Sequence, residues 1–185
     1  MSPTYFLDTS ALVKLYHSEA GTERVEAVFN QLESPAVISE LATVEIYAAL
    51  ARRVRMGDIT ARAHDEAIQN FEDDCVQRFI VDPLGSPVMH KARELLQKYG
   101  STRALRTLDA LQLGACLMVQ SRGEVVFVCA DTPLGALGRL EGLTVLNPEM
   151  PRERAEAPPA QNVGPPEERS AERSEGSTSH GCAEA

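Results

Sequence analysis

The chain has 185 residues, of which 43% are hydrophobic and 24% are charged, and this composition is typical of a globular protein with one apolar core. Its longest apolar run, residues 110–119, is too short to span a bilayer, and the amino-terminal residues lack the pattern of a signal peptide. We therefore expect a cytoplasmic protein without a membrane segment. The formal net charge of −9 argues against a basic surface that covers the whole molecule.

The cysteines and histidines do not show the spacing of zinc ligands. No two cysteines are arranged as C-x-x-C, and two of them lie in apolar runs, where a free thiol behaves as a small core residue. We expect free thiols rather than disulfides or zinc ligands. The residues concerned are Cys75, Cys116, Cys129 and Cys182, together with His17, His64, His90 and His180.

The composition changes abruptly after Met150. Residues 151–185 contain five prolines and no Leu, Ile, Phe, Tyr or Met, so this segment buries too little apolar surface to offset the entropy cost of ordering it. It carries seven Glu against four Arg, which leaves a net charge of about −6 on residues 1–150. We expect a folded domain at 1–150 and a disordered tail rich in Pro, Glu and Arg at 151–185.

Residues 1–150 alternate short β-branched runs with amphipathic segments of helical period. The expected strands are 4–8, 36–39, 79–84, 124–131 and 143–148. The expected helices are 11–19, 21–32, 41–56, 59–77, 86–100, 106–122 and 132–142. This alternation predicts a doubly wound α/β domain, in which helices cover both faces of a parallel sheet. Ligands of such sheets bind beyond the carboxyl ends of the strands.

Two carboxylates end apolar strands. Asp8 follows the first expected strand, and Asp131 follows the fourth. Each has a simpler interpretation as the cap of the next helix, Asp8 together with Ser10 and Asp131 together with Thr132. If the first helix is capped by a side chain, we assign that role to Ser10 and keep Asp8 for a ligand.

Two further carboxylates lie within helices. Asp109 is one turn from Gln112 in a helix that is otherwise apolar nearly all round, and an acid inside a buried helix needs a partner. Glu45 stands at the edge of the core-facing stripe of its helix. That stripe is expected at Leu41, Val44 and Ala48. Taken singly, Asp109 could pair with a nearby arginine and Glu45 could be a solvated helix residue.

Taken together, the four acids predict one pocket at the carboxyl edge of the sheet. Several carboxylates in one pocket repel one another, so they either raise their pKa values or recruit a cation. Oxygen ligands without His or Cys favour a hard ion, Mg²⁺ or Mn²⁺.

Other chemistries lack their required residues. A phosphatase of the haloacid-dehalogenase type needs a second Asp two residues after Asp8, where this chain has Ser10. No strand is followed by G-x-G-x-x-G or by a P-loop, which removes dinucleotide binding and P-loop phosphate binding. Ser10 and Ser39 have no suitably placed His to activate them as nucleophiles.

Four motifs in order resemble those of PIN-domain nucleases, and within them the VapC-type toxins of toxin–antitoxin pairs. They are "YFLDTSALVKLY", "VISELATVEIYAAL", "LRTLDALQLGAC" and "VFVCADTPL", and the likeness extends from residue 5 to about residue 147. The family often has a further acid after the fourth motif's Asp, whereas this chain has Thr132 and Pro133 there.

The resemblance implies a three-layer α/β/α sandwich with a central, mainly parallel sheet. It also implies Mg²⁺- or Mn²⁺-dependent cleavage of RNA phosphodiester bonds, with inhibition by a small cognate antitoxin. Carried over to this sequence, the catalytic and metal-binding acids are Asp8, Glu45, Asp109 and Asp131, and the residues that support them are Thr9, Ser10 and Ser39.

Two alternatives stay open at this point: a non-catalytic or degenerate module that binds an antitoxin or another protein through the acidic groove, and a structure-specific DNA nuclease. Attraction of a nucleic-acid backbone must come from local charge. The candidate RNA-binding residues are Arg52, Arg53, Arg55, Arg103 and Arg106. The helices at 41–56 and 59–77 form a hairpin that either pairs with a second copy, giving a homodimer, or folds back on the sheet.

Overall fold

The computed structural model describes residues 2–150, so the tail expected at 151–185, with Cys182, lies outside the described residues. In chain order the elements are β1 (Thr4–Leu7), α1 (Thr9–Leu12), the 3₁₀ turn η1 (Val13–Leu15), α2 (Thr22–Phe29), β2 (Ala36–Ser39), α3 (Glu40–Met56), α4 (Ala61–Gln77), β3 (Phe79–Asp82), α5 (Ser86–Tyr99), α6 (Thr107–Gln120), β4 (Val125–Val128), α7 (Thr132–Leu140) and β5 (Thr144–Leu146). Within 2–150, every helix is too short or too polar to cross a membrane.

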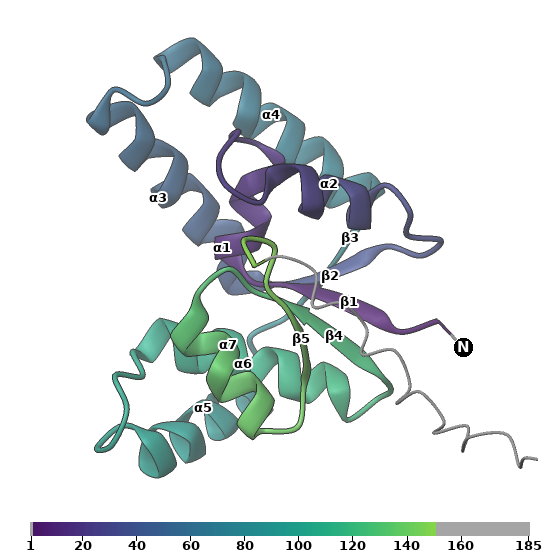
Figure 1. Ribbon diagram of the computed structural model, residues 1–185, viewed down its shortest axis with the longest axis vertical. Helices are drawn as coiled ribbons and strands as arrows, with labels where there is room; N and C mark the ends of the chain where they lie inside the picture. The colour runs from purple at the N-terminus through teal and green to yellow at the C-terminus, as the bar shows by residue number, and fades with distance from the viewer. Residues whose placement is uncertain (1, 151–185) are drawn as a thin grey trace, which may run out of the picture. The chain divides into compact units, whose positions relative to one another are not determined.

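The five strands form one sheet in the order β3-β2-β1-β4-β5, and every pair of neighbours is parallel (Figure 1). β1 is central, with β2 on one side and β4 on the other. From β1 the chain winds outward through β2 to β3, and it then returns to the other side for β4 and β5. The order of the strands therefore reverses between β1 and β4, and such switch points are where ligands bind in open parallel sheets.

Helices cover both faces of the sheet, as the alternation of side chains along the strands requires. In β1, Phe6 belongs to a core cluster with α5, α6 and α7, whereas Leu7 belongs to a second cluster with α1, α2, α3 and α4. Figure 1 shows the two groups of helices above and below the strands. The predicted three-layer α/β/α sandwich with a parallel sheet is confirmed.

Helix α6 is the most buried helix of its layer, as its apolar composition predicts. Seven of its side chains or glycine positions are buried, and it packs along α5. Gly114 permits this close approach, since a Cβ there would lie 3.3 Å from the Ala92 nitrogen and 3.3 Å from the Val88 carbonyl oxygen. Cys116 of this helix is buried with a free thiol. The free thiols expected at Cys75 and Cys129 are confirmed as well.

The helix expected at 11–19 is shorter in the structure. α1 ends at Leu12, and η1 carries the chain only to Leu15. Lys14 in η1 is 2% exposed and pairs with Glu19 and Glu149, each at 2.7 Å. A tightened 3₁₀ turn directs this lysine inward, and a buried cation is retained where carboxylates pair with it.

The core-facing stripe expected on α3 is wrong, because it lies on nearly the opposite side of the helix from the buried residues, roughly 165° away at about 100° per residue. The buried residues are Ala42, Ile46 and Leu50, whereas Val44 is 67% exposed. Both stripes have helical spacing, and the one with the larger side chains faces the core. Glu45 directly precedes Ile46, so its half-buried side chain lies at the border of the core face.

Candidate active site

The two strand-end acids lie side by side at the switch point. β1 and β4 pair so that Leu7 is opposite Val128, and the Asp8 nitrogen donates a hydrogen bond of 2.9 Å to the Val128 carbonyl. Asp131 follows the end of β4 and begins α7. The chain leaves β1 toward one layer and β4 toward the other, which opens a crevice between the two loops.

All four predicted acids line one pocket in that crevice, with a volume of about 360 Å³. β1 and β4 supply Asp8 and Asp131 at their ends, α3 supplies Glu45 and α6 supplies Asp109. The complete lining is Asp8, Thr9, Ser10, Glu45, Ala48, Ala49, Arg52, Leu108, Asp109, Gln112, Asp131 and Leu134.

Asp8 is the most buried of these acids, with 5% of its surface exposed. Burial raises the pKa of Asp8 to about 6, the two hydrogen bonds from Ser10 oppose this rise, and the charges of Glu45 and Asp109 add to it. On its inner side, the Cys129 Sγ lies 3.7 Å from Asp8 Oδ2, and burial raises the pKa of this thiol. A carboxylate in such surroundings favours either a proton or a cation.

Ser10 connects Asp8 with the turn before α7. Its hydroxyl donates to Asp8 Oδ2 at 2.5 Å, and it accepts hydrogen bonds from the Ala130 and Asp131 nitrogens at 3.0 and 3.2 Å. The cap of α1 is Asp8 itself, which accepts from the Ser10 nitrogen, so the assignment of this cap to Ser10 is wrong. The cap uses a single oxygen, Oδ2, which leaves Asp8 Oδ1 without a hydrogen bond from a described residue.

Glu45 accepts hydrogen bonds from a network of side chains whose connections were not predicted from the sequence. Gln112, 2% exposed, donates from Nε2 to Glu45 Oε2 at 2.7 Å and to Thr9 Oγ1 at 2.8 Å. Its Oε1 accepts from Ser39 Oγ at 2.7 Å, and Thr9 also donates to Glu45 Oε2 at 2.5 Å. Thr9 and Ser39 therefore both belong to this network, and Gln112 is the residue that joins them. The sequence offered one sign of this role, which is that Gln112 is a polar residue in an otherwise apolar helix.

Replacement of Gln112 by leucine is expected to lower the free energy of unfolding by about 2 kcal/mol, since Ser39 and Glu45 are left without their buried partner. Urea denaturation followed by circular dichroism measures the change. The matched control is Gln97→Leu on the exposed face of α5, where we expect a change within about 0.5 kcal/mol. Equal stability of Gln112→Leu and the wild type would contradict the network.

Asp109 lies in the first turn of α6, with its side chain half-buried. Burial raises its pKa, and the negative charge of Asp131 raises it further, whereas Arg106 acts in the opposite direction. Asp109 stands in the first turn of α6, and the partial positive charge at the amino-terminal end of a helix favours a negative side chain there. Among the described residues, Asp109 has no ion pair with an arginine, so the simple pairing interpretation does not account for it.

Asp131 caps α7 through a hydrogen bond of 2.8 Å from the Leu134 nitrogen to its Oδ1. The residues on both sides of it bond to Asn147, which is 8% exposed. Asn147 Nδ2 donates to the Ala130 carbonyl at 3.2 Å and to Thr132 Oγ1 at 3.4 Å. Sequence reasoning missed Asn147 because an Asn directly after a strand is an ordinary turn residue.

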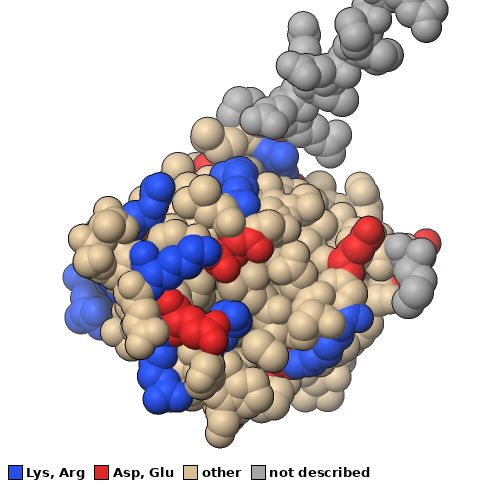
Figure 2. Space-filling view, turned by 90° about the horizontal axis from the view of Figure 1, so that it is seen from below, with Lys and Arg blue, Asp and Glu red and all other residues tan. Residues whose placement is uncertain are grey.

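The five candidate arginines do not act alike. Arg52 lines the acidic pocket, but Arg53 pairs with Glu19 and Asp58. Arg103 and Arg106 line a neighbouring cavity, and Arg55 is exposed at the end of α3. Figure 2 shows basic and acidic side chains intermixed on one face of the molecule. The described face therefore carries no continuous basic patch, and of the five candidates Arg52, Arg103 and Arg106 lie beside the acidic site.

The donor set of the pocket fits a hard divalent cation. Within residues 2–150, no group of three or more His, Cys, Asp or Glu side chains lies close enough together to hold a metal ion by itself. Mg²⁺ does not require one, because it keeps several waters and is held by one or two carboxylates together with substrate phosphates. Burial raises the pKa of Asp8 and of Asp109, the charge of Glu45 adds to both rises, and a cation in this pocket would offset them.

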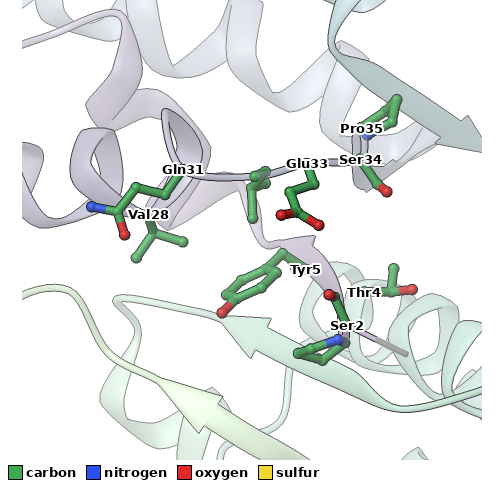
Figure 3. Close-up of a pocket in the computed structure, with 10 residues that line it drawn as sticks. Ser2, Thr4, Tyr5, Val28, Gln31, Glu33, Ser34 and Pro35 are labelled. Carbon is green, nitrogen blue, oxygen red and sulfur yellow. The ribbon is translucent and has the colours of Figure 1, made fainter.

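A separate cavity of about 390 Å³ lies at the amino-terminal ends of β1 and β2 (Figure 3). Tyr5 and Glu33 line it, together with Gln31 and Pro35. It shares no residue with the acidic pocket, and its single carboxylate offers no comparable charge cluster.

Comparison with known proteins agrees with this geometry. The family model described as PIN domain matches residues 5–139. Ribonuclease VapC45 of Mycobacterium tuberculosis (strain CDC 1551 / Oshkosh) and Ribonuclease VapC49 of Mycobacterium tuberculosis (strain ATCC 25618 / H37Rv) are each 33% identical over 126 residues, covering 68% of this chain and 83% of the relative. The chain belongs to the PIN-domain family, and the resemblance inferred from its four motifs is confirmed.

Solved structures share the fold at lower identity. Mycobacterium tuberculosis VapC20, described as a toxin that cleaves the sarcin–ricin loop, superposes with a TM-score of 0.57 at 18% identity, covering 73% of this chain and 95% of that one. FitAcB from Neisseria gonorrhoeae superposes with a TM-score of 0.58 at 16% identity, covering 78% and 98%. At these identities the likeness establishes the three-layer fold alone.

Proposed function

We propose that this protein is a metal-dependent endoribonuclease and the toxin of a toxin–antitoxin pair. The observation that carries the proposal is the convergence of four carboxylates, from β1, α3, α6 and the β4–α7 turn, in one pocket at the switch point of a PIN-domain sheet. The ribonuclease names of the two curated relatives support RNA as the substrate.

We assign each residue of the pocket a separate role. Asp8, Glu45 and Asp109 would hold Mg²⁺ or Mn²⁺, and a cation bound there supplies an acidified water and positive charge for the phosphoryl oxygens. Ser10 holds Asp8 in place, and Gln112 holds Glu45. A carboxylate of this set accepts the proton of the attacking water.

Asp131 is proposed as the fourth acid, with one oxygen for the cap of α7 and one for the pocket. Its Oδ1 accepts from Leu134, which leaves Oδ2 without a partner among the described residues. This arrangement suits a carboxylate that binds a water of the cation or orients Asp109 across the pocket.

The protein partner is proposed to be a cognate antitoxin. Solved neighbours include a toxin–antitoxin complex from Klebsiella pneumoniae and VapBC2 from Rickettsia felis bound to a DNA fragment from their promoter. The acidic pocket is suited to accept a basic side chain of such an inhibitor, because that charge would neutralise the same carboxylates that a cation does.

We also propose a homodimer formed through α3. Helices α3 and α4 form a hairpin whose connecting end projects from the sheet, as Figure 1 shows. Val44 and Ala48 are exposed on one side of α3, and Val44 is 67% exposed. Sedimentation of the wild type and of Val44→Lys tests this assignment, and a dimer that persists unchanged in the variant would contradict it.

Cleavage of RNA and of DNA with the same base sequence by one purified sample tests the substrate class. We expect cleavage of RNA in Mn²⁺ and none of DNA. Equal cleavage of both would favour the DNA-nuclease alternative, and cleavage of neither with retained binding of a protein partner would favour a degenerate module.

Replacing Arg52 by glutamate is expected to weaken RNA binding and to lower the slope of log affinity against log salt by about 0.7, the value for one phosphate that the variant no longer neutralises. Arg52 lines the pocket and has no ion pair among the described residues. Fluorescence anisotropy at several salt concentrations measures the slope. Arg93→Glu, exposed on α5, makes the same change in net charge and is expected to keep the wild-type slope.

A further inference from the structure

The acidic pocket continues into a second cavity of about 410 Å³. Asp109, Asp131 and Leu134 line both, so two of the four carboxylates stand at the boundary between the two cavities. Its remaining walls come from two segments, the connection between α5 and α6 and the first turns of α7.

One side of this cavity is apolar. Pro133, Leu134, Ala136 and Leu137 line it from α7, and Ala104 faces them from the connecting segment. A volume of this size lies within the range of about 300–1,000 Å³ found for pockets that bind small molecules. The surface offered is suited to a flat group with an apolar face.

Two guanidinium groups without a partner among the described residues line the same cavity. Arg103 and Arg106 are exposed, and their side chains make no ion pair or hydrogen bond with another described residue. Arg53 and Arg122, by contrast, are paired with carboxylates. Free guanidinium groups beside an apolar slot can pair with phosphates and stack on planar rings.

We propose that this cavity binds the unpaired base of the nucleotide next to the scissile phosphate. The inference rests on the proposed ribonuclease function and adds a specificity site to it. A nucleobase has an apolar face for the α7 wall and polar edges for Arg103 and Arg106. The phosphates on either side of it would reach these arginines and the acidic pocket. Proteins that read single-stranded RNA commonly hold splayed bases in this way.

The test uses a short single-stranded RNA whose cleavage site has been mapped, with each base beside that site replaced in turn by an abasic ribose. For the wild type we expect kcat/KM to fall about tenfold at one neighbouring position, the size of effect found when one base is deprived of its stacking partner. Binding of the same RNAs is compared by fluorescence anisotropy in excess chelator, so the base site is tested separately from cleavage.

Variants that fill the cavity give the matched comparison. In Ala136→Phe, we expect about tenfold lower kcat/KM on intact RNA and no further loss on the abasic RNA, because the base is already excluded. Ala104→Trp fills the cavity from an exposed position and guards against misfolding of the first variant. Arg93→Ala, which lines neither cavity, is expected to keep the wild-type pattern.

Equal binding and cleavage of intact and abasic RNAs by the wild type would overturn the base site. The base site would also be overturned if Ala136→Phe lost as much kcat/KM on the abasic RNA as it does on intact RNA. Failure of the wild type to cleave any RNA, with base-dependent binding retained, would instead contradict the ribonuclease function and leave the base site standing.

Discussion

Asp8→Asn is expected to reduce RNA cleavage about 10³-fold, because a ligand of the reacting centre loses its charge while the pocket keeps its shape. In the wild type, the Ser10 nitrogen and hydroxyl donate to Asp8 Oδ2. The side-chain oxygen of asparagine can accept the same two hydrogen bonds. The fold should therefore persist, and kcat rather than KM should carry the loss. Single-turnover cleavage of a labelled RNA measures the effect.

The same substitution is expected to stabilise the metal-free protein at pH 7. The pKa of Asp8 is about 6 in the folded protein against an ordinary 3.8, so its contribution to stability is full below about pH 4 and is lost as the pH rises through 6. Asparagine carries no such loss, and the free energy of unfolding at pH 7 should rise by up to about 3 kcal/mol.

Urea denaturation in excess chelator at pH 7 and at pH 4 checks this prediction. The gain of Asp8→Asn over the wild type should be present at pH 7 and should disappear at pH 4. Asp73→Asn, on the exposed face of α4, is the control and should follow the wild type at both pH values. Wild-type activity in Asp8→Asn, or a gain that does not depend on pH, would contradict the role given to this buried carboxylate.

Asp109→Asn is the second variant with a large expected effect, a loss of cleavage of about 10³-fold for the same reason. Its effect on stability should be small, because the side chain is half-buried and its charge interacts favourably with the start of α6. The contrast separates the two acids: both substitutions abolish cleavage, but the gain in stability at pH 7 should be clearly larger for Asp8→Asn, because Asp8 is the more deeply buried carboxylate.

The readouts for Asp109→Asn are kcat, KM and the midpoint of thermal unfolding. A thermal midpoint within a few degrees of the wild type, with kcat reduced, is expected. Retained kcat with raised KM would show that Asp109 serves substrate binding alone.

The architecture was predictable because short β-branched runs alternate along the chain with segments of helical period. This pattern predicted the order of the elements, and β2 has the predicted bounds of 36–39. The first helical segment was expected to be longer than it is. Lys14 in its 3₁₀ turn is buried and pairs with Glu149, 135 residues away in the sequence, and no local pattern contains that contact.

The four acids could be predicted as a set, because each is a charged residue in an apolar stretch of sequence. The residues that hydrogen-bond to these acids were harder to predict. Gln112 was visible as a polar residue in an apolar helix, but its partners Ser39 and Glu45 come from other elements. Asn147 gave no signal at all, because its bonds to Ala130 and Thr132 exist only once β5 lies beside β4.

Cleavage of RNA by one sample, in excess chelator and again after Mg²⁺ or Mn²⁺ is restored, tests the central claim most directly. If the carboxylates at the switch point act by holding a divalent cation, cleavage is absent in chelator and returns with the metal, and Asp8→Asn stays inactive in both conditions. Full cleavage in excess chelator would contradict the account.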